Sequence, residues 1–194
     1  MDPLPPFAAV VLAGGRAARL GGQPKPQLAV GGRSMLSTVL TALDGAGPRV
    51  VVGPPQPVPA GVLLVREEPP GGGPVPALMA GLAAVGDAEV VAVLAADLPF
   101  VTTALLTALR ERLTGDGVLV VDDTGRDQLL LGVWRTAALR DAAQGARPHA
   151  PLRTVLARLA VRRYRPPVAP GLPPPWTDCD TPAELARARA AAGS

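Results

Sequence analysis

Short apolar runs alternate with helix-like patterns along most of this 194-residue chain. The clearest run, residues 90–95, is apolar at every position and rich in valine. A strand without a polar face is typical of the centre of a parallel sheet, because helices cover both of its faces. The alternation therefore predicts an α/β fold, a three-layer α/β/α sandwich with a mostly parallel, Rossmann-like sheet. The length suits one domain, which we expect to span residues 1–194.

Capping residues and periodicity place the individual elements. Ser34 and either Thr102 or Thr103 stand where helix caps are expected, and Thr181 with Glu184 has the pattern of a capping box. Apolar residues at helical spacing predict the other helices. The expected strands are residues 7–12, 50–52, 62–65, 90–95, 118–121, 129–134 and 161–164, and the expected helices are residues 35–43, 76–85, 103–113, 152–159 and one that starts after Thr181.

A glycine-rich loop follows the first expected strand. Residues 12–25 contain four glycines, two arginines and Lys25, the only lysine in the chain. Backbone N–H groups in such a turn can close on phosphate oxygens, and the cations then neutralise phosphate charge. The P-loop pattern does not fit because Lys25 stands between two prolines. The dinucleotide fingerprint does not fit because no helix is expected to open at the loop, which should stay extended to Gly31 and Gly32. The loop predicts a site for a nucleoside triphosphate or a similar polyphosphate.

Two further segments are expected at the same edge of the sheet. Ligands of open parallel sheets bind at the carboxyl ends of the strands, so the glycine loop should meet residues 71–74 and Asp97 there. A carboxylate at that edge could supply an oxygen ligand for a divalent cation. Alternatively, Asp97 ends its strand and caps the next turn ahead of Pro99.

Composition excludes several classes of protein. The formal net charge of +3 is too small to indicate nucleic-acid binding. Cys179 is the single cysteine, so neither a disulfide framework nor a multi-cysteine metal site is expected. The first residues lack the pattern of a signal peptide, and no apolar run has the length of a membrane span. We expect a cytoplasmic protein that binds neither nucleic acid nor membranes.

Ordered motifs along the chain resemble those of the molybdenum cofactor guanylyltransferase group of nucleotidyltransferases and its cytidylyltransferase relatives. Residues 12–25 resemble the opening glycine motif of that family, and residues 73–82 resemble its Gly-Pro-Leu-x-Gly segment. Residues 96–100 match its Asp-Leu-Pro-Phe motif, and residues 178–185 match its closing segment. The resemblance covers nearly the whole chain.

The resemblance implies a Mg²⁺-dependent attack by a phosphate of molybdopterin on the α-phosphate of GTP, with pyrophosphate leaving. Arg16 and Lys25 would offset charge on the leaving pyrophosphate. Asp97 would bind the metal, with Asp180 as the second ligand and Asp178 as the alternative to it. Glu68 is the implied acidic contact to the guanine base. The full set implied to bind nucleotide is Leu12, Ala13, Gly14, Gly15, Arg16, Lys25, Gly53, Glu68 and Asp97, of which Arg16, Lys25 and Asp97 are catalytic.

Several alternatives stay open. Pro24 and Gly53 replace residues usual in the guanylyltransferases, an aspartate and an asparagine, so CTP could be used in place of GTP. The chain could also be a transferase of the same fold with another phosphorylated acceptor, or a nucleotide-binding module that delivers cofactor without catalysis. Transient contact with molybdoenzymes or other cofactor-biosynthesis proteins is expected. Residues 125–135 and 145–153 are expected to line the acceptor site. Their arginines suit an anionic acceptor; these are Arg126, Arg135, Arg147 and Arg153.

Overall fold

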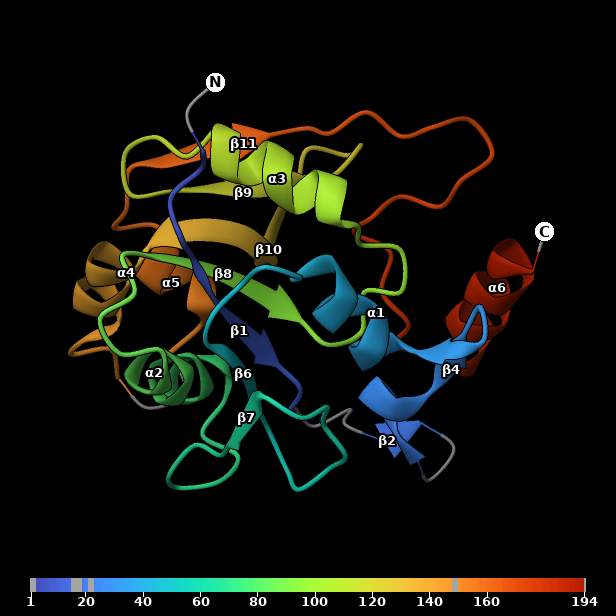
Figure 1. Ribbon diagram of the computed structural model, residues 1–194, viewed down its shortest axis with the longest axis horizontal. Helices are drawn as coiled ribbons and strands as arrows, with labels where there is room; N and C mark the ends of the chain where they lie inside the picture. The colour runs from blue at the N-terminus through green and yellow to red at the C-terminus, as the bar shows by residue number, and fades with distance from the viewer. Residues whose placement is uncertain (1–2, 15–18, 21–22, 148–149, 194) are drawn as a thin grey trace.

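A central sheet organises the fold. The computed structural model describes residues 3–14, 19–20, 23–147 and 150–193, and structural statements refer to this part of the chain. In it, seven strands form one sheet. From edge to edge these are β11 (Val161–Tyr164), β9 (Gly117–Val121), β10 (Asp127–Arg135), β8 (Val90–Ala95), β1 (Ala8–Leu12), β6 (Arg49–Val52) and β7 (Val62–Val65). Figure 1 shows the sheet between two groups of helices.

The sheet is mostly parallel, as the alternating pattern predicts. Strand β1 pairs in parallel with β6 and β8, β6 pairs in parallel with β7, and β11 pairs in parallel with β9. Strand β10 is the exception, because it runs antiparallel to both β8 and β9. The N-terminal end of β10 therefore lies at the same edge of the sheet as the carboxyl end of β8.

Alternate residues of the fully buried strand β1 enter two different cores. Ala9 and Val11 pack with α1 (Met35–Ala42) and α3 (Thr103–Glu111) on one face. Ala8 and Val10 pack with α2 (Pro74–Ala84), α4 (Thr136–Ala143) and α5 (Leu152–Leu156) on the other face. This arrangement confirms the three-layer sandwich.

Capping side chains start the helices at the expected places. The Ser34 hydroxyl accepts a hydrogen bond from the Ser37 amide at 3.1 Å, and α1 follows. Thr102, and not Thr103, caps α3 by accepting from the Leu105 amide at 3.3 Å. The expected capping box precedes α6 (Pro182–Ala192). Each cap satisfies an amide that the helix itself leaves unpaired.

Several boundaries differ from the sequence-based expectation. Helix α2 begins at Pro74, because the fixed backbone of proline suits the first turn. Helix α5 ends at Leu156, and α4 was not predicted because no side chain caps its N-terminus. The segment expected to stay extended instead forms the 3₁₀ turn η1 (Lys25–Gln27) and two short hairpins. These hairpins are β2 (Arg19–Leu20) with β3 (Gln23–Pro24), and β4 (Ala29–Val30) with β5 (Arg33–Ser34).

Helix α2 lies unusually close to the sheet at Gly81. A Cβ atom at this position would lie 2.4 Å from Cγ1 of Val10, so only glycine permits the contact. We expect Gly81→Ala to lower the free energy of unfolding by about 1–3 kcal/mol, because the strand or the helix must move apart. Urea unfolding measures the change. Ala83→Ser, on the exposed side of the same helix, should change stability by no more than about 0.5 kcal/mol. Equal stability of Gly81→Ala and the parent protein would contradict the close packing.

Candidate active site

A cavity of about 840 Å³ opens at the edge of the sheet where β1 and β8 end. Residues 12–14 form one wall, continuing directly from β1. Residues 95–97, at the end of β8, lie beside them, and the Ala96 amide donates to the Leu12 carbonyl at 3.0 Å. Gly73 and Pro74, where α2 begins, contribute another wall. The first residues of the glycine loop, 12–14, and Asp97 therefore meet at the carboxyl ends of the strands, as expected.

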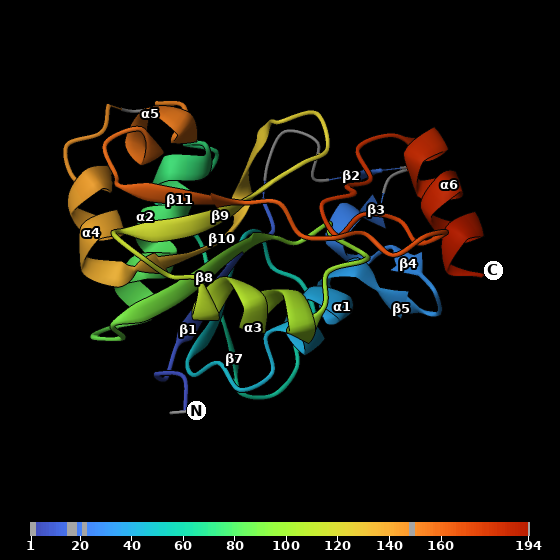
Figure 2. The same cartoon turned by 90° about the horizontal axis from the view of Figure 1, so that it is seen from above.

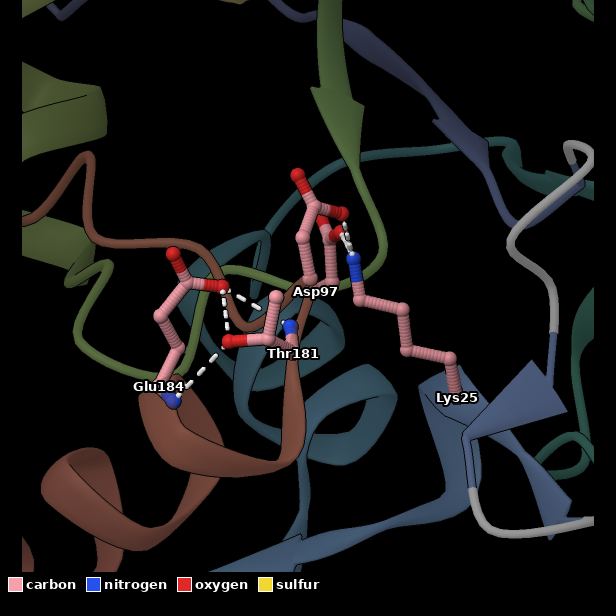
Figure 3. A network of polar contacts seen from close by, with 5 residues as sticks. Lys25, Asp97, Thr181 and Glu184 are labelled. Carbon is pink, nitrogen blue, oxygen red and sulfur yellow. Dashed lines mark hydrogen bonds and ion pairs between the residues drawn. The ribbon is translucent and has the colours of Figure 1, made fainter.

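Lys25 is the central charged group of this cavity. Its side chain is only 6% exposed, and its ammonium donates hydrogen bonds to Asp97 Oδ2 and Asp180 Oδ1 (Figure 3). Burial by itself lowers the pKa of Lys25, but the hydrogen bonds and charges of Asp180 and Asp97 outweigh it. The pKa of Lys25 is therefore raised above its ordinary value, and the group is a permanent cation at neutral pH.

The two carboxylates come from distant parts of the chain. Asp97 follows β8 by two residues, and Asp180 immediately precedes the capping box of α6. In that box the Thr181 amide donates to Glu184 Oε2 at 2.8 Å, and the Glu184 amide donates to Thr181 Oγ1 at 3.2 Å (Figure 3). These bonds fix the chain direction next to Asp180, so the helix start aims this carboxylate at Lys25.

A small hydrophobic core joins the three segments that carry the charged groups. Leu28, three residues after Lys25, packs with Cys179, which precedes Asp180. Phe100, three residues after Asp97, packs against the same cluster. Figure 2 shows α6 beside β4 and β5 at one end of the molecule, close to α1. The cluster consists of Leu28, Val30, Met35, Cys179, Leu185 and Ala188. Burial raises the pKa of the Cys179 thiol to about 11, so this side chain is an inert packing group.

Two glutamines connect the lysine turn to the loop after β6. Gln27 Nε2 donates to Gln56 Oε1 at 3.1 Å and to the Pro57 carbonyl at 3.2 Å. Gln56 Nε2 in turn donates to the carbonyl of Pro54, a residue of the cavity wall, at 3.4 Å. This bridge holds the turn that carries Lys25 at a fixed separation from the loop after β6.

The donor set fits a divalent cation whose remaining ligands come from a substrate. No cluster of three or more His, Cys, Asp or Glu side chains occurs in the described residues. Asp97 and Asp180 nevertheless converge on one point, and Mg²⁺ commonly binds through one or two carboxylates plus phosphate oxygens. Asp178 instead lines a separate, smaller cavity. Desolvation and the charges of Asp180 and Asp97 raise the pKa of Asp178.

The structure describes seven of the nine residues expected to bind nucleotide. Leu12, Ala13 and Gly14 line the cavity together with Lys25 and Asp97. Gly15 and Arg16 lie outside the described residues.

Gly53 is buried and does not line the cavity, and a Cβ there would be 3.0 Å from the Ala13 carbonyl. The glycine that replaces the expected asparagine thus lets the end of β6 approach the glycine loop.

The acidic pair after β7 is arranged differently from the expectation. Glu68 is exposed and does not line the cavity, whereas Glu67 and Arg66 do. Glu67 Oε1 accepts a hydrogen bond from the Gly71 amide at 3.0 Å, which closes the turn over residues 67–71. Two adjacent acids could not be told apart from sequence, because this turn decides which one faces inward.

The arginines expected at the acceptor site do not line the cavity. Arg135 lies at the opposite edge of the sheet, where it pairs with Val90 at the start of β8 and donates to the Gly115 carbonyl at 3.1 Å. Arg126, Arg147 and Arg153 are exposed. Leu130, which belongs to the expected stretch 125–135, does line the cavity. It sits in an irregular stretch of β10 between Gln128 and Gly132, where the register with β9 shifts.

A family profile described as the MobA-like NTP transferase domain matches residues 9–163. The chain belongs to this family. A probable molybdenum cofactor guanylyltransferase from Mycobacterium tuberculosis is 36% identical over 138 residues, which cover 68% of this chain and 69% of that protein. Membership of the family makes the chain a nucleotidyltransferase, in agreement with the resemblance of its sequence motifs.

Solved structures show the same fold. A crystal structure of molybdopterin-guanine dinucleotide biosynthesis protein A from Archaeoglobus fulgidus has a TM-score of 0.67 and 21% identity, over 94% of this chain and 97% of that one. A 2-C-methyl-D-erythritol 4-phosphate cytidylyltransferase from Thermus thermophilus has a TM-score of 0.68 and 20% identity, over 95% and 98%. The fold thus serves proteins named for different nucleotides, so it does not identify the nucleotide used. In the described residues, no helix is long and apolar enough to cross a membrane.

Proposed function

We propose that this protein transfers a GMP unit from GTP to molybdopterin and releases pyrophosphate. The observation that carries the proposal is the meeting of Lys25, Asp97 and Asp180 in a cavity that residues 12–14 help to line. Phosphoryl-type transfer requires positioned cations more than covalent chemistry, and Lys25 is a positioned cation in this site. The guanylyltransferase name of the mycobacterial relative supports GTP and molybdopterin as the substrates.

In the proposed reaction an oxygen of the acceptor phosphate attacks the α-phosphorus of GTP. A phosphorus–oxygen bond forms there, and the bond to the oxygen that bridges the α- and β-phosphates breaks. Lys25 neutralises charge that gathers on the departing pyrophosphate. Asp97 and Asp180 would hold Mg²⁺, which when bound stabilises negative charge on the phosphate oxygens. We assign binding of the triphosphate to the amide of Gly14, which lines the cavity. We assign the same role to the Gly15 amide and to Arg16 from their places in the sequence motif.

Glu67 is the acid that we assign to the guanine base, in place of Glu68. One oxygen of Glu67 closes its own turn, so the other is free to accept from the base. We expect Glu67→Gln to lower kcat/KM for GTP about 10- to 100-fold, because the negative charge on the acceptor of a guanine N–H group is lost. Glu68→Gln is the matched control and should leave kcat/KM within about twofold. Steady-state kinetics with GTP measure both variants, and equal effects would contradict the assignment.

A pyrophosphate-release assay with molybdopterin and each of the four nucleoside triphosphates tests the function. GTP-dependent release that requires both molybdopterin and Mg²⁺ is expected. Faster pyrophosphate release with CTP than with GTP would show that the protein transfers CMP and not GMP. Binding of a nucleotide without release, in the presence of molybdopterin, would instead identify a delivery module that lacks catalysis. The nucleotide that raises Tm most in the presence of Mg²⁺ gives an independent measure of preference.

A further inference from the structure

The cation that the two carboxylates share is supplied by the protein itself. The ammonium of Lys25 bridges Asp97 and Asp180, whose side chains are 20% and 58% exposed. In the described part of the chain, neither carboxylate forms an ion pair with any other cation. Lys25 therefore stands between the two groups that a divalent cation would also need.

We infer that Lys25 fills the cation position of the nucleotide-free site, so that a divalent metal ion binds there only together with a triphosphate. This inference rests on the proposed function, since it assigns the metal to Asp97 and Asp180 and the triphosphate to the same cavity. It adds an order of binding to that function: metal and nucleotide arrive as one complex, and the side chain of Lys25 moves from the carboxylates to the phosphates.

Electrostatic competition is the physical reason. The ammonium and a divalent ion need the same carboxylate oxygens, and a divalent ion placed next to a buried ammonium is repelled by it. A triphosphate removes this conflict, because its negative charges give the ammonium new partners. The carboxylates of Asp97 and Asp180 are then available to a metal ion. Two observations favour such an exchange over a fixed structural ion pair: Lys25 lines the cavity, and Asp180 remains more than half exposed.

The ammonium also has capacity left for a substrate. A lysine ammonium can donate three hydrogen bonds, and in the described structure the two carboxylates receive two of them. The third can be given to a phosphate oxygen before the other two are released. Transfer of Lys25 onto a nucleotide can thus proceed stepwise, without a stage in which the buried ammonium lacks a partner.

Binding of Mn²⁺ to nucleotide-free protein, measured by electron paramagnetic resonance of the free ion, tests the inference. Lys25→Met removes the charge at similar length and should bind Mn²⁺ at least about tenfold more tightly than the parent protein. Lys25→Arg retains the charge and should show no gain. The double variant Lys25→Met with Asp180→Asn should lose the gain in Mn²⁺ affinity. That loss would show that the added Mn²⁺ affinity arises at this pair of carboxylates. A folded Lys25→Met protein that binds Mn²⁺ no more tightly than the parent would overturn the inference.

A second measurement uses the parent protein and avoids any risk of misfolding. Because Lys25 is the only lysine, growth with ¹⁵N-lysine gives one side-chain ammonium resonance. Mg²⁺ alone should leave this resonance in place, and Mg²⁺ with GTP should move it. An equal shift with Mg²⁺ alone would overturn the inference. These readouts do not depend on turnover: a protein that meets both expectations yet releases no pyrophosphate would refute the proposed function and leave the inference standing.

Discussion

Asp97→Asn is expected to lower kcat by at least about 1,000-fold, the largest effect of any single replacement in this site. The asparagine keeps the shape of the side chain but loses the charge that would hold a divalent cation next to the glycine loop. Lys25 also loses one of its two ion-pair partners, so the free energy of unfolding should fall by about 1–3 kcal/mol. Single-turnover kinetics measure the chemical step, and urea unfolding measures the loss of stability.

Asp178→Asn is the matched control for this experiment. Burial, together with the nearby charges of Asp180 and Asp97, raises the pKa of Asp178, but this residue lines the separate smaller cavity. Its replacement should change kcat by no more than about twofold. If Asp178→Asn abolished turnover and Asp97→Asn did not, the assignment of the metal ligands would be wrong.

Lys25→Met is expected to lower kcat about 100- to 1,000-fold while changing the affinity for GTP much less. The reason is that charge grows on the pyrophosphate as it leaves, so a nearby cation stabilises the transition state more than the bound nucleotide. The same variant should bind Mn²⁺ more tightly in the absence of nucleotide. Turnover and metal affinity would then change in opposite directions, which general damage to the fold cannot produce.

Lys25→Arg separates charge from geometry at this position. A guanidinium keeps the positive charge but is larger and planar, and the site around Lys25 is nearly closed to solvent. We expect partial activity, between that of the parent protein and that of Lys25→Met, in assays of kcat.

Equal losses of kcat and GTP affinity in Lys25→Met would contradict the catalytic role, because that pattern is typical of a residue that only binds.

Much of the fold could be predicted because local rules agree with the tertiary structure. The apolar run at residues 90–95 is the central strand β8, and the capping box at Thr181 starts α6. Neither depends on distant residues for its identity. Helix α4 escaped prediction because its start has no capping side chain. The antiparallel direction of β10 follows from the short turn over residues 122–126, which reverses the chain between β9 and β10.

The place of the candidate site in the fold was predictable from the sequence, but the contacts within it were not. The glycine motif and Asp97 could be assigned to one edge of the sheet, because strand ends place them there. The pairing of Lys25 with Asp97 and Asp180 could not be predicted, because the two aspartates follow Lys25 by 72 and 155 positions in the sequence. A small core around Cys179 brings the three segments together. The same holds for Glu67, whose inward position depends on a hydrogen bond to Gly71.

The mass of the pterin product tests the central claim most directly. Purified protein is incubated with Mg²⁺, GTP and molybdopterin, and the pterin is analysed by mass spectrometry beside a parallel reaction with CTP. We predict that the pterin gains one GMP unit, that pyrophosphate appears in equal amount, and that Asp97→Asn gives neither product. A pterin of unchanged mass after incubation with GTP, from protein that is folded and binds the nucleotide, would contradict the proposed function.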